Sequence, residues 1–143
     1  MKKMNSTIEK MFKLAREAQE NAYAPYSNFS VGACIKTTSG EYFSGANVEN
    51  VSYALTVCAE QAACSTMVSS GCRHIAEILI IGGAEDICPP CGACRQLLYE
   101  FSQEDTLIYL CNDKGLQASV NLVDLLPSAF SSKHMEVCTS TET

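Results

Sequence analysis

The sequence predicts an α/β protein with three layers, α/β/α, in which helices cover both faces of one mixed sheet of about five strands. Three observations predict this fold class. Two short and almost continuously apolar runs, at residues 75–81 and 107–111, are typical of strands buried on both faces. Helix-like segments alternate with strand-like segments along the chain. No internal repeat or linker interrupts the pattern, which indicates a single domain.

The first predicted helix, over residues 6–21, is amphipathic. Its apolar side chains recur at i, i+3, i+4 and i+7, at Ile8, Met11, Phe12 and Ala15. Pro25 cannot lie inside a helix, so an ordered turn is predicted around it.

Two strands, a loop and a second helix are predicted next. Residues 29–37 and 41–46 are strand-like, and the Thr-Ser-Gly sequence at 38–40 is typical of a hairpin. The polar segment 47–53 is then a loop. It leads into a helix over residues 57–70, which a glycine follows.

The second half of the chain continues the alternation. Its predicted elements are a strand at 75–81, a helix ending near residue 101, strands at 107–111 and 116–120, and a short helical piece at 122–130 interrupted by Pro127. We expect one domain over residues 1–130 and a flexible C-terminal tail over the Ser/Thr-rich residues 131–143.

Composition and charge exclude several classes of function. The 143 residues are 47% hydrophobic and 18% charged, without an apolar run long enough to span a membrane. The net charge of −6 argues against a nucleic-acid partner, because that binding depends on neutralising phosphates. The amphipathic N-terminal segment does not resemble a secretory signal, so we expect a cytoplasmic protein. In a reducing cytosol, the nine cysteines would be metal ligands or small core residues.

Two cysteine-containing stretches are placed to open helices, at residues 56–63 (TVCAEQAA) and 89–96 (PPCGACRQ). Cys91 and Cys94 are three residues apart, so their sulfurs share one face of a first helical turn and can reach a single ion. Helix N-termini favour thiolates because they carry partial positive charge and free N–H groups. If the two termini meet, Cys58 joins this pair in a three-thiolate site for Zn²⁺. The open fourth position is typical of catalytic zinc.

Glu60 would lie beside this ion without binding it, because it follows Cys58 by two residues. A carboxylate in that place can act first as a base and then as an acid. Cys88 remains an alternative ligand, since it also forms a C-x-x-C pair with Cys91, and a fourth ligand would close the site. Simple burial of the thiols is the plainer alternative for the three ligands. Structural roles are expected for Cys34, Cys64, Cys72, Cys111, Cys138, His74 and His134.

With these motifs the sequence resembles the small, homotetrameric, zinc-dependent cytidine deaminases. The resemblance extends from about residue 22 to residue 130. Its pieces occur in one order: 22–33 (AYAPYSNFSVGA), 45–53 (GANVENVSY), the two cysteine stretches, and Leu125-Leu126-Pro127 with Phe130. Zinc deaminases commonly have a histidine as the first ligand, and Cys58 corresponds to the three-cysteine variant.

The resemblance implies a role for each site residue. Cys58, Cys91 and Cys94 would hold one Zn²⁺ per subunit, and Glu60 would be the catalytic proton shuttle. Substrate contacts are implied for Phe29, Asn47, Glu49, Ala59 and Phe130. Asn47 and Glu49 would contact ribose hydroxyls, whereas Phe130 would complete the pocket of a neighbouring subunit in a homotetramer. The plainer alternatives are that Asn47 and Glu49 shape a loop and that the two phenylalanines pack within their own subunit.

Two further residues are expected to tune the metal. Three thiolates give the zinc centre a net charge of −1, which helix dipoles offset in part. The tetrameric family usually has an arginine directly after the glutamate, close enough to donate to the sulfurs. This sequence has Gln61 there, which donates without adding charge, and Arg95 is the candidate for compensating it.

The implied function is hydrolytic deamination of cytidine and 2′-deoxycytidine to uridine and 2′-deoxyuridine, with release of ammonia, in pyrimidine salvage. Three alternatives stay open: a deaminase of a related aminopyrimidine nucleoside such as blasticidin S, a non-catalytic zinc-stabilised nucleoside-binding protein, and a thiol redox protein using Cys91 and Cys94. Glu60 favours an enzyme, because a binding protein needs no carboxylate beside an open metal position.

Overall fold

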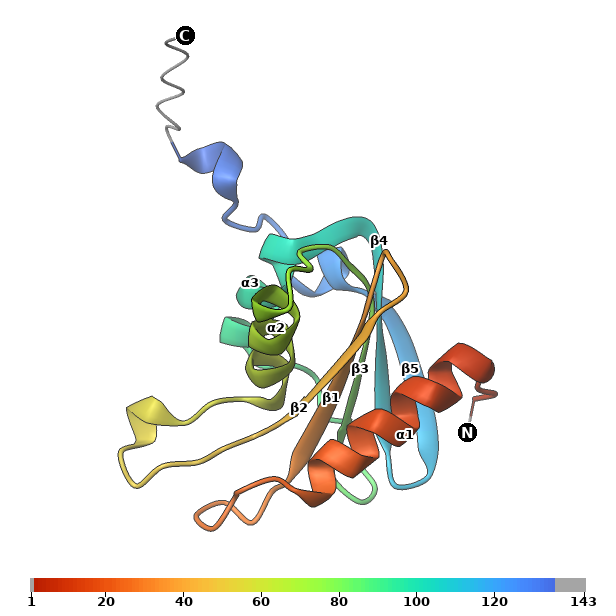
Figure 1. Cartoon of the computed structure of the whole chain (residues 1–143), viewed down its shortest axis with the longest axis vertical. Coiled ribbons are helices and arrows are strands. Elements are labelled where there is room, and N and C mark those ends of the chain that lie inside the picture. Colours follow the sequence, from red (N-terminus) through yellow and green to blue (C-terminus); the bar gives the residue numbers. More distant parts are fainter. Residues whose placement is uncertain (1, 136–143) are drawn as a thin grey trace, which may run out of the picture.

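The computed structural model describes residues 2–135 and has the α/β/α layers predicted from the sequence (Figure 1). Its elements in chain order are α1 (Ser6–Glu20), β1 (Val31–Thr37), β2 (Tyr42–Ala46), the 3₁₀ helix η1 (Tyr53–Leu55), α2 (Ala59–Ser69), β3 (Ile75–Gly82), α3 (Gly92–Phe101), β4 (Ser102–Asn112), β5 (Gly115–Asn121), and the 3₁₀ helices η2 (Leu122–Leu125) and η3 (Ser132–His134). Within the described part of the chain, every helix is too short or too polar to cross a bilayer.

The five strands form one mixed sheet in the order β2-β1-β3-β4-β5. β3 and β4 are parallel because α3 connects them as a crossover, and the other neighbouring pairs are antiparallel. Val31 pairs with Gly82, and Gly32 pairs with Ala46. The start of β1 and the ends of β2 and β3 therefore lie at the same edge of the sheet.

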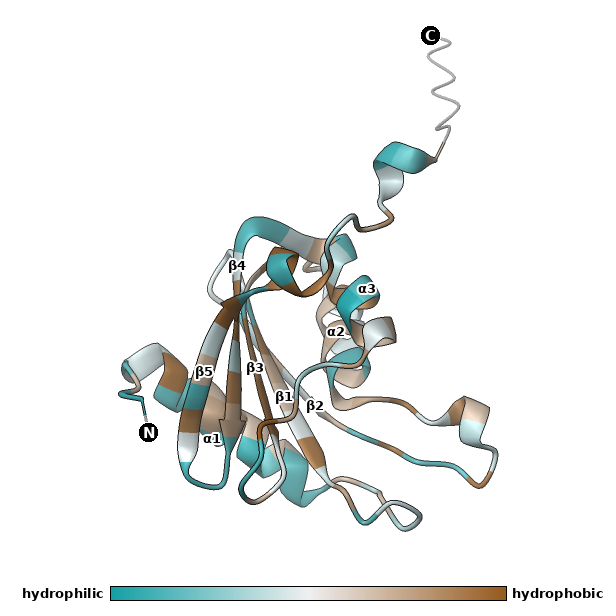
Figure 2. Cartoon of the chain, turned by 180° about the vertical axis from the view of Figure 1, so that it is seen from behind, coloured by the Kyte–Doolittle hydropathy of each residue, from teal (hydrophilic) through white to brown (hydrophobic). Residues whose placement is uncertain are grey.

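One face of the sheet is covered by α1 alone (Figures 1 and 2). The Asn5 side chain caps this helix by accepting a hydrogen bond of 2.9 Å from the backbone N–H of Ile8. Ile8, Met11 and Ala15 are buried as the spacing predicted, whereas Phe12 is only partly buried. They pack on residues of the central strands that face this layer, including Leu79.

The opposite face is covered by α2 and α3 (Figure 1). Ala59, Ala63 and Met67 of α2 are buried in a core that also contains Leu98 of α3 and the isoleucines of the central strands. Gly45 of β2 lets α2 approach closely, because a Cβ at this position would lie 2.8 Å from the Ala59 carbonyl oxygen. This contact fixes where α2 begins.

Two segments differ from the sequence prediction. β4 begins at Ser102, not near residue 107, because the hydroxyl group of buried Thr106 hydrogen-bonds the polar first half of this strand to β3. The Thr106 hydroxyl donates to the Ile75 carbonyl oxygen and accepts from the Gln103 N–H. Only residues 122–125 of the helical piece at 122–130 are helical. Of the predicted tail, residues 131–135 include η3, whereas residues 136–143, with Cys138, lie outside the described part.

Candidate active site

Both cysteine stretches open helices on the same face of the sheet, as predicted. α2 begins directly after Cys58, and α3 begins directly after Cys91. Both cysteines have the extended backbone of an N-cap residue, but neither side chain caps its helix. Each sulfur is therefore free to bind another partner at a helix end of positive potential.

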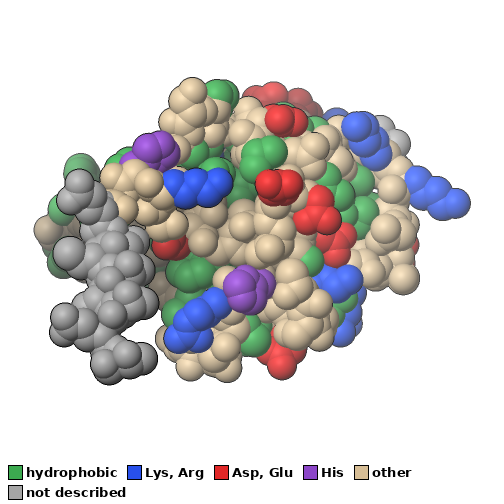
Figure 3. All heavy atoms as spheres, turned by 90° about the horizontal axis from the view of Figure 1, so that it is seen from above, with side chains coloured by type: hydrophobic (Ala, Val, Ile, Leu, Met, Phe, Trp, Pro, Cys, Tyr) green, Lys and Arg blue, Asp and Glu red, His purple; other side chains and the backbone are tan. Residues whose placement is uncertain are grey.

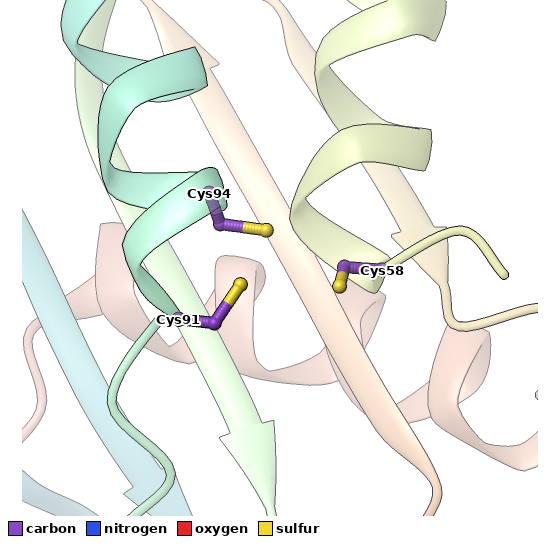
Figure 4. A group of neighbouring side chains, drawn as sticks. All are labelled: Cys58, Cys91 and Cys94. Carbon is purple, nitrogen blue, oxygen red and sulfur yellow. The ribbon is translucent and has the colours of Figure 1, made fainter. Parts of the chain in front are cut away.

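The three sulfurs meet between these two helix ends (Figure 4). The Sγ atoms of Cys58, Cys91 and Cys94 all lie within 4.8 Å of one another. Around a tetrahedral zinc ion with Zn–S distances of about 2.3 Å, sulfur atoms would be about 3.8 Å apart. The cluster therefore needs only small side-chain adjustments to hold such an ion, and its sulfur donors suit zinc.

The three thiols differ in acidity. Burial raises the pKa of Cys58, and burial together with the nearby Glu60 charge raises the pKa of Cys94. Burial also acts on Cys91, but hydrogen bonds from the Cys94 backbone and the neighbouring thiols outweigh it and lower the Cys91 pKa overall. Closely packed sulfurs without a cation disfavour three simultaneous thiolates, whereas a divalent cation would compensate their charge.

Glu60 lies in the first turn of α2 with only 5% of its surface exposed. Burial raises the pKa of its carboxyl group, although contact with Cys94 acts in the opposite direction. A buried carboxyl group with a raised pKa is suited to exchanging protons near neutral pH.

A pocket of about 210 Å³ opens beside the sulfur cluster. Its lining comes from the start of β1, the end of β2, the N-terminus of α2 and the approach to α3, namely Phe29, Val31, Asn47, Thr56, Val57, Cys58, Ala59, Glu60, Cys88, Pro89 and Cys91. Thr56 also lines a neighbouring hollow of about 300 Å³ with Tyr26, Ser27, Glu49 and Tyr53. Sequence reasoning missed Thr56, Tyr26 and Tyr53, whose spacing carries no metal or acid–base signal.

Asn47 is buried at the pocket wall and ties two backbone positions together. Its Oδ1 accepts from the Val31 N–H at 2.9 Å, and its Nδ2 donates to the Phe29 carbonyl oxygen at 2.8 Å. The side chain therefore shapes the loop before β1, and one amide hydrogen and one lone pair remain for a ligand.

Glu49 lies in the neighbouring hollow and organises the turn around Pro25. Its Oε1 accepts from the backbone N–H groups of Tyr26 at 3.0 Å and Ser27 at 3.1 Å, and its other oxygen accepts from the Ser27 hydroxyl. The Ser27 hydroxyl lowers the pKa of this carboxyl group. Glu49 therefore stays ionised and can still accept from a ligand hydroxyl.

Of the other three predicted substrate contacts, two line the pocket and one does not. Phe29 and Ala59 line the pocket beside the sulfurs, with Phe29 43% exposed and Ala59 fully buried. Phe130 is 59% exposed, stacks on His134 and is not among the residues that line this pocket. Figure 1 shows its segment leaving the body of the domain.

Among residues 2–135, neither of the two residues expected to tune the metal donates a hydrogen bond to the sulfurs. Gln61 is exposed, and within residues 2–135 its amide donates to none of the three sulfur atoms. The Arg95 side chain instead binds the carbonyl oxygens of Pro90 and Leu125.

Cys88 lines the pocket without joining the three-sulfur cluster. It packs against Gly82, since a Cβ on Gly82 would lie 3.1 Å from the Cys88 Cβ. The group of sulfurs close enough to share an ion, as found among residues 2–135, is Cys58, Cys91 and Cys94. This geometry favours an open three-ligand site over the closed alternative.

An α/β/α fold with three sulfurs at two helix N-termini, next to a buried carboxylate and a pocket, defines a metalloenzyme type of site. Comparison with known proteins identifies the class further. Residues 5–111 match the family described as the cytidine and deoxycytidylate deaminase zinc-binding region. The chain therefore belongs to the cytidine and deoxycytidylate deaminase family.

Curated relatives and solved structures agree with this assignment. A cytidine deaminase of Halalkalibacterium halodurans is 42% identical over 125 residues, covering 87% of this chain and 95% of the relative. A cytidine deaminase of Sporosarcina psychrophila is 38% identical over 128 residues, covering 90% of this chain and 94% of the relative. The crystal structure of cytidine deaminase from Burkholderia pseudomallei is similar with a TM-score of 0.81 and 40% identity, covering 89% of this chain and all of that one.

Proposed function

We propose that this protein catalyses the hydrolytic deamination of cytidine and 2′-deoxycytidine to uridine and 2′-deoxyuridine, with release of ammonia. One observation carries the proposal: buried Glu60 lines the same pocket as the open three-sulfur cluster. The relatives named cytidine deaminase, which match almost the full length of the chain, support this substrate class.

Cys58, Cys91 and Cys94 would hold the zinc ion. When bound, zinc supplies Lewis acidity, which lowers the pKa of a coordinated water from 15.7 to about 7. The helix N-termini of α2 and α3 direct N–H groups and partial positive charge toward the three sulfurs, which stabilises their thiolate forms. The missing fourth protein ligand leaves space on the pocket side for the reaction.

Glu60 would move the protons. Its carboxylate takes a proton from the attacking water and delivers it to N3 of the base, which makes C4 more electrophilic. It then takes the proton of the new hydroxyl group on C4 and passes it to the amine, so that ammonia leaves as the carbonyl forms. The raised pKa of buried Glu60 suits a group that must be both base and acid near neutral pH.

The substrate side of the pocket would be formed by the loops before β1 and after β2. Phe29 would offer an aromatic face to the base, and Ala59 lines the pocket next to Cys58. Asn47 and Glu49 keep free hydrogen-bonding capacity for the ribose hydroxyls after organising their own loops.

Phe130 would complete the pocket of a neighbouring subunit in a homotetramer, and its exposure on an outlying segment supports this arrangement. A cytoplasmic location and a role in pyrimidine salvage complete the proposal. Nucleic acid is not an expected partner: basic and acidic side chains are interspersed on the face seen in Figure 3, and the net charge is −6.

The test is ammonia release from cytidine by purified wild type and by Glu60→Gln, with zinc content measured for both. We expect an active wild type and a variant that keeps zinc but loses at least about 10³-fold in kcat, because its amide cannot exchange protons. If wild type binds zinc but releases no ammonia from cytidine, 2′-deoxycytidine or blasticidin S, the protein is a zinc-stabilised binding protein. Activity on blasticidin S alone would replace the proposed substrate and leave the site intact.

A further inference from the structure

Arg95 joins two segments of the chain that are 30 or more residues apart. Its Nε donates to the carbonyl oxygen of Pro90 at 2.8 Å, and its Nη1 donates to the carbonyl oxygen of Leu125 at 3.0 Å. Both hydrogen bonds are partly buried, and both are charge-assisted. The guanidinium group thus connects the approach to α3 with η2.

The Pro90 carbonyl group is important because it directly precedes Cys91. The backbone N–H of Arg95 also binds the Cys91 carbonyl oxygen at 2.9 Å, as the first hydrogen bond of α3. Arg95 therefore holds both carbonyl groups next to the Cys91 Cα, that of Pro90 and that of Cys91 itself. Pro89 and Pro90 have no backbone N–H groups, so the backbone of this segment can be fixed by hydrogen bonds mainly through its carbonyl oxygens.

We propose that Arg95 is a positioning residue that orients the Cys91 sulfur toward the metal and links this ligand to the C-terminal segment. The proposal rests on the metal site of the proposed function. Arg95 holds Leu125, and the next residue, Gln96, donates from Nε2 to the Phe130 carbonyl oxygen at 2.9 Å. The two side chains that follow Cys94 thus fasten both ends of residues 125–130 to α3.

Arg95 acts through backbone geometry and not by neutralising the sulfurs, because its donors bind carbonyl oxygens. A lysine distinguishes the two roles. Lysine keeps the positive charge, but its compact ammonium group cannot reproduce the fork of the guanidinium, which reaches two separate carbonyls. If charge were the important property, Arg95→Lys would preserve the metal site.

The test measures zinc retention, with no substrate present. Wild type, Arg95→Met, Arg95→Lys and a control, Arg16→Met, are challenged with a chromogenic zinc chelator at fixed pH. Arg16 pairs with Asp113 at 2.7 Å on the α1 side of the sheet, so its loss removes an arginine contact away from the metal. The Co²⁺-substituted proteins report the ligand geometry by absorption spectroscopy, and circular dichroism reports folding.

We expect Arg95→Met and Arg95→Lys to lose about 10- to 100-fold in zinc affinity, the range found when a residue that orients a metal ligand is removed. Their Co²⁺ spectra should change, whereas Arg16→Met should stay within about twofold of wild type. Wild-type affinity in Arg95→Lys, or in a folded Arg95→Met, would overturn the proposal. If Arg95→Met does not fold, Arg95→Lys decides alone.

The outcomes separate this proposal from the proposed function. A wild type that binds zinc without releasing ammonia from cytidine refutes the deaminase function but leaves the Arg95 result interpretable. An active wild type whose Arg95 variants retain zinc as tightly refutes only the role of Arg95.

Discussion

Replacing Gly45 by alanine should disturb the metal site through packing alone. The added Cβ would lie 2.8 Å from both the Ala59 carbonyl oxygen and the Ala62 Cβ, and the Ala63 nitrogen would be closer still. An ordinary contact begins at 3.4 Å, and the Ala63 nitrogen would lie at 2.4 Å, so α2 must move by about 1 Å. Because Ala59 is the first residue of α2, the movement displaces the helix end that bears Cys58 and Glu60.

The expected cost has two parts. Overpacking of this kind destabilises by about 1–3 kcal/mol. At a denaturant sensitivity of about 2 kcal/mol per M, the urea midpoint should fall by about 1 M. Misplacement of catalytic groups by approximately 1 Å can reduce the rate by about 10²-fold, so kcat for cytidine should fall by about 10- to 100-fold.

Gly32→Ala is the matched control. Its Cβ would lie 2.0 Å from the Ala15 carbonyl oxygen and 2.9 Å from both the Ala15 carbonyl carbon and the Gln19 Cβ, on the α1 side of the sheet. Urea unfolding at one protein concentration should show a loss of stability for both variants that is at least as large for Gly32→Ala, because its clash is the closer one. Steady-state kinetics should show a loss of kcat for Gly45→Ala only. Equal kcat values in the two variants would refute the argument that the Gly45 contact sets the position of the catalytic groups.

Two further outcomes follow from the cysteines. Cys94→Ala should reduce bound zinc, measured by elemental analysis, from one ion per subunit to below about 0.1 and should abolish activity, because two thiolates hold zinc far less tightly than three. The control is Cys72→Ala, which changes a thiol outside the cluster that donates to Glu41. It should keep both the zinc and the activity. Burial raises the pKa of Cys111 to about 12, so this thiol should resist iodoacetamide at pH 8 in the native protein and react in urea, as measured by peptide mass spectrometry. Rapid native modification of Cys111 would contradict its buried position.

The sequence was most informative where local spacing and burial decide the structure. Residues 75–81 were predicted as a strand to within one residue, because helices cover both faces of β3 and its side chains, apart from Glu77, are apolar. The start of β4 was missed because residues 102–105 are polar, and only the buried hydroxyl of Thr106 shows why they pair. Propensity carries no information about such a tertiary hydrogen bond.

The same distinction applies to the site. Cys91 and Cys94 share a helical turn by spacing alone, so their proximity was predictable from the sequence. The contacts of the Arg95 guanidinium group were not predictable from the sequence. Its second partner, Leu125, follows β4 and β5 in the chain, and only the fold brings the two residues together. The predicted roles of Phe29, Asn47 and Phe130 stay predictions for experiments with substrate.

The loops proposed to bind substrate are joined to the predicted zinc ligands by a short backbone ladder. Val48 exchanges two hydrogen bonds with Val57, at 2.9 and 2.8 Å, and the residues on either side of Val48 bind the backbone of Tyr23. Val57 directly precedes Cys58, so the segment that would hold the ribose is hydrogen-bonded to the neighbour of a predicted zinc ligand. A shift of this loop therefore changes the backbone that orients Cys58. Substitutions within residues 50–55, beyond the ladder, can alter substrate selection without such a shift, because those residues are exposed and make few contacts with the core.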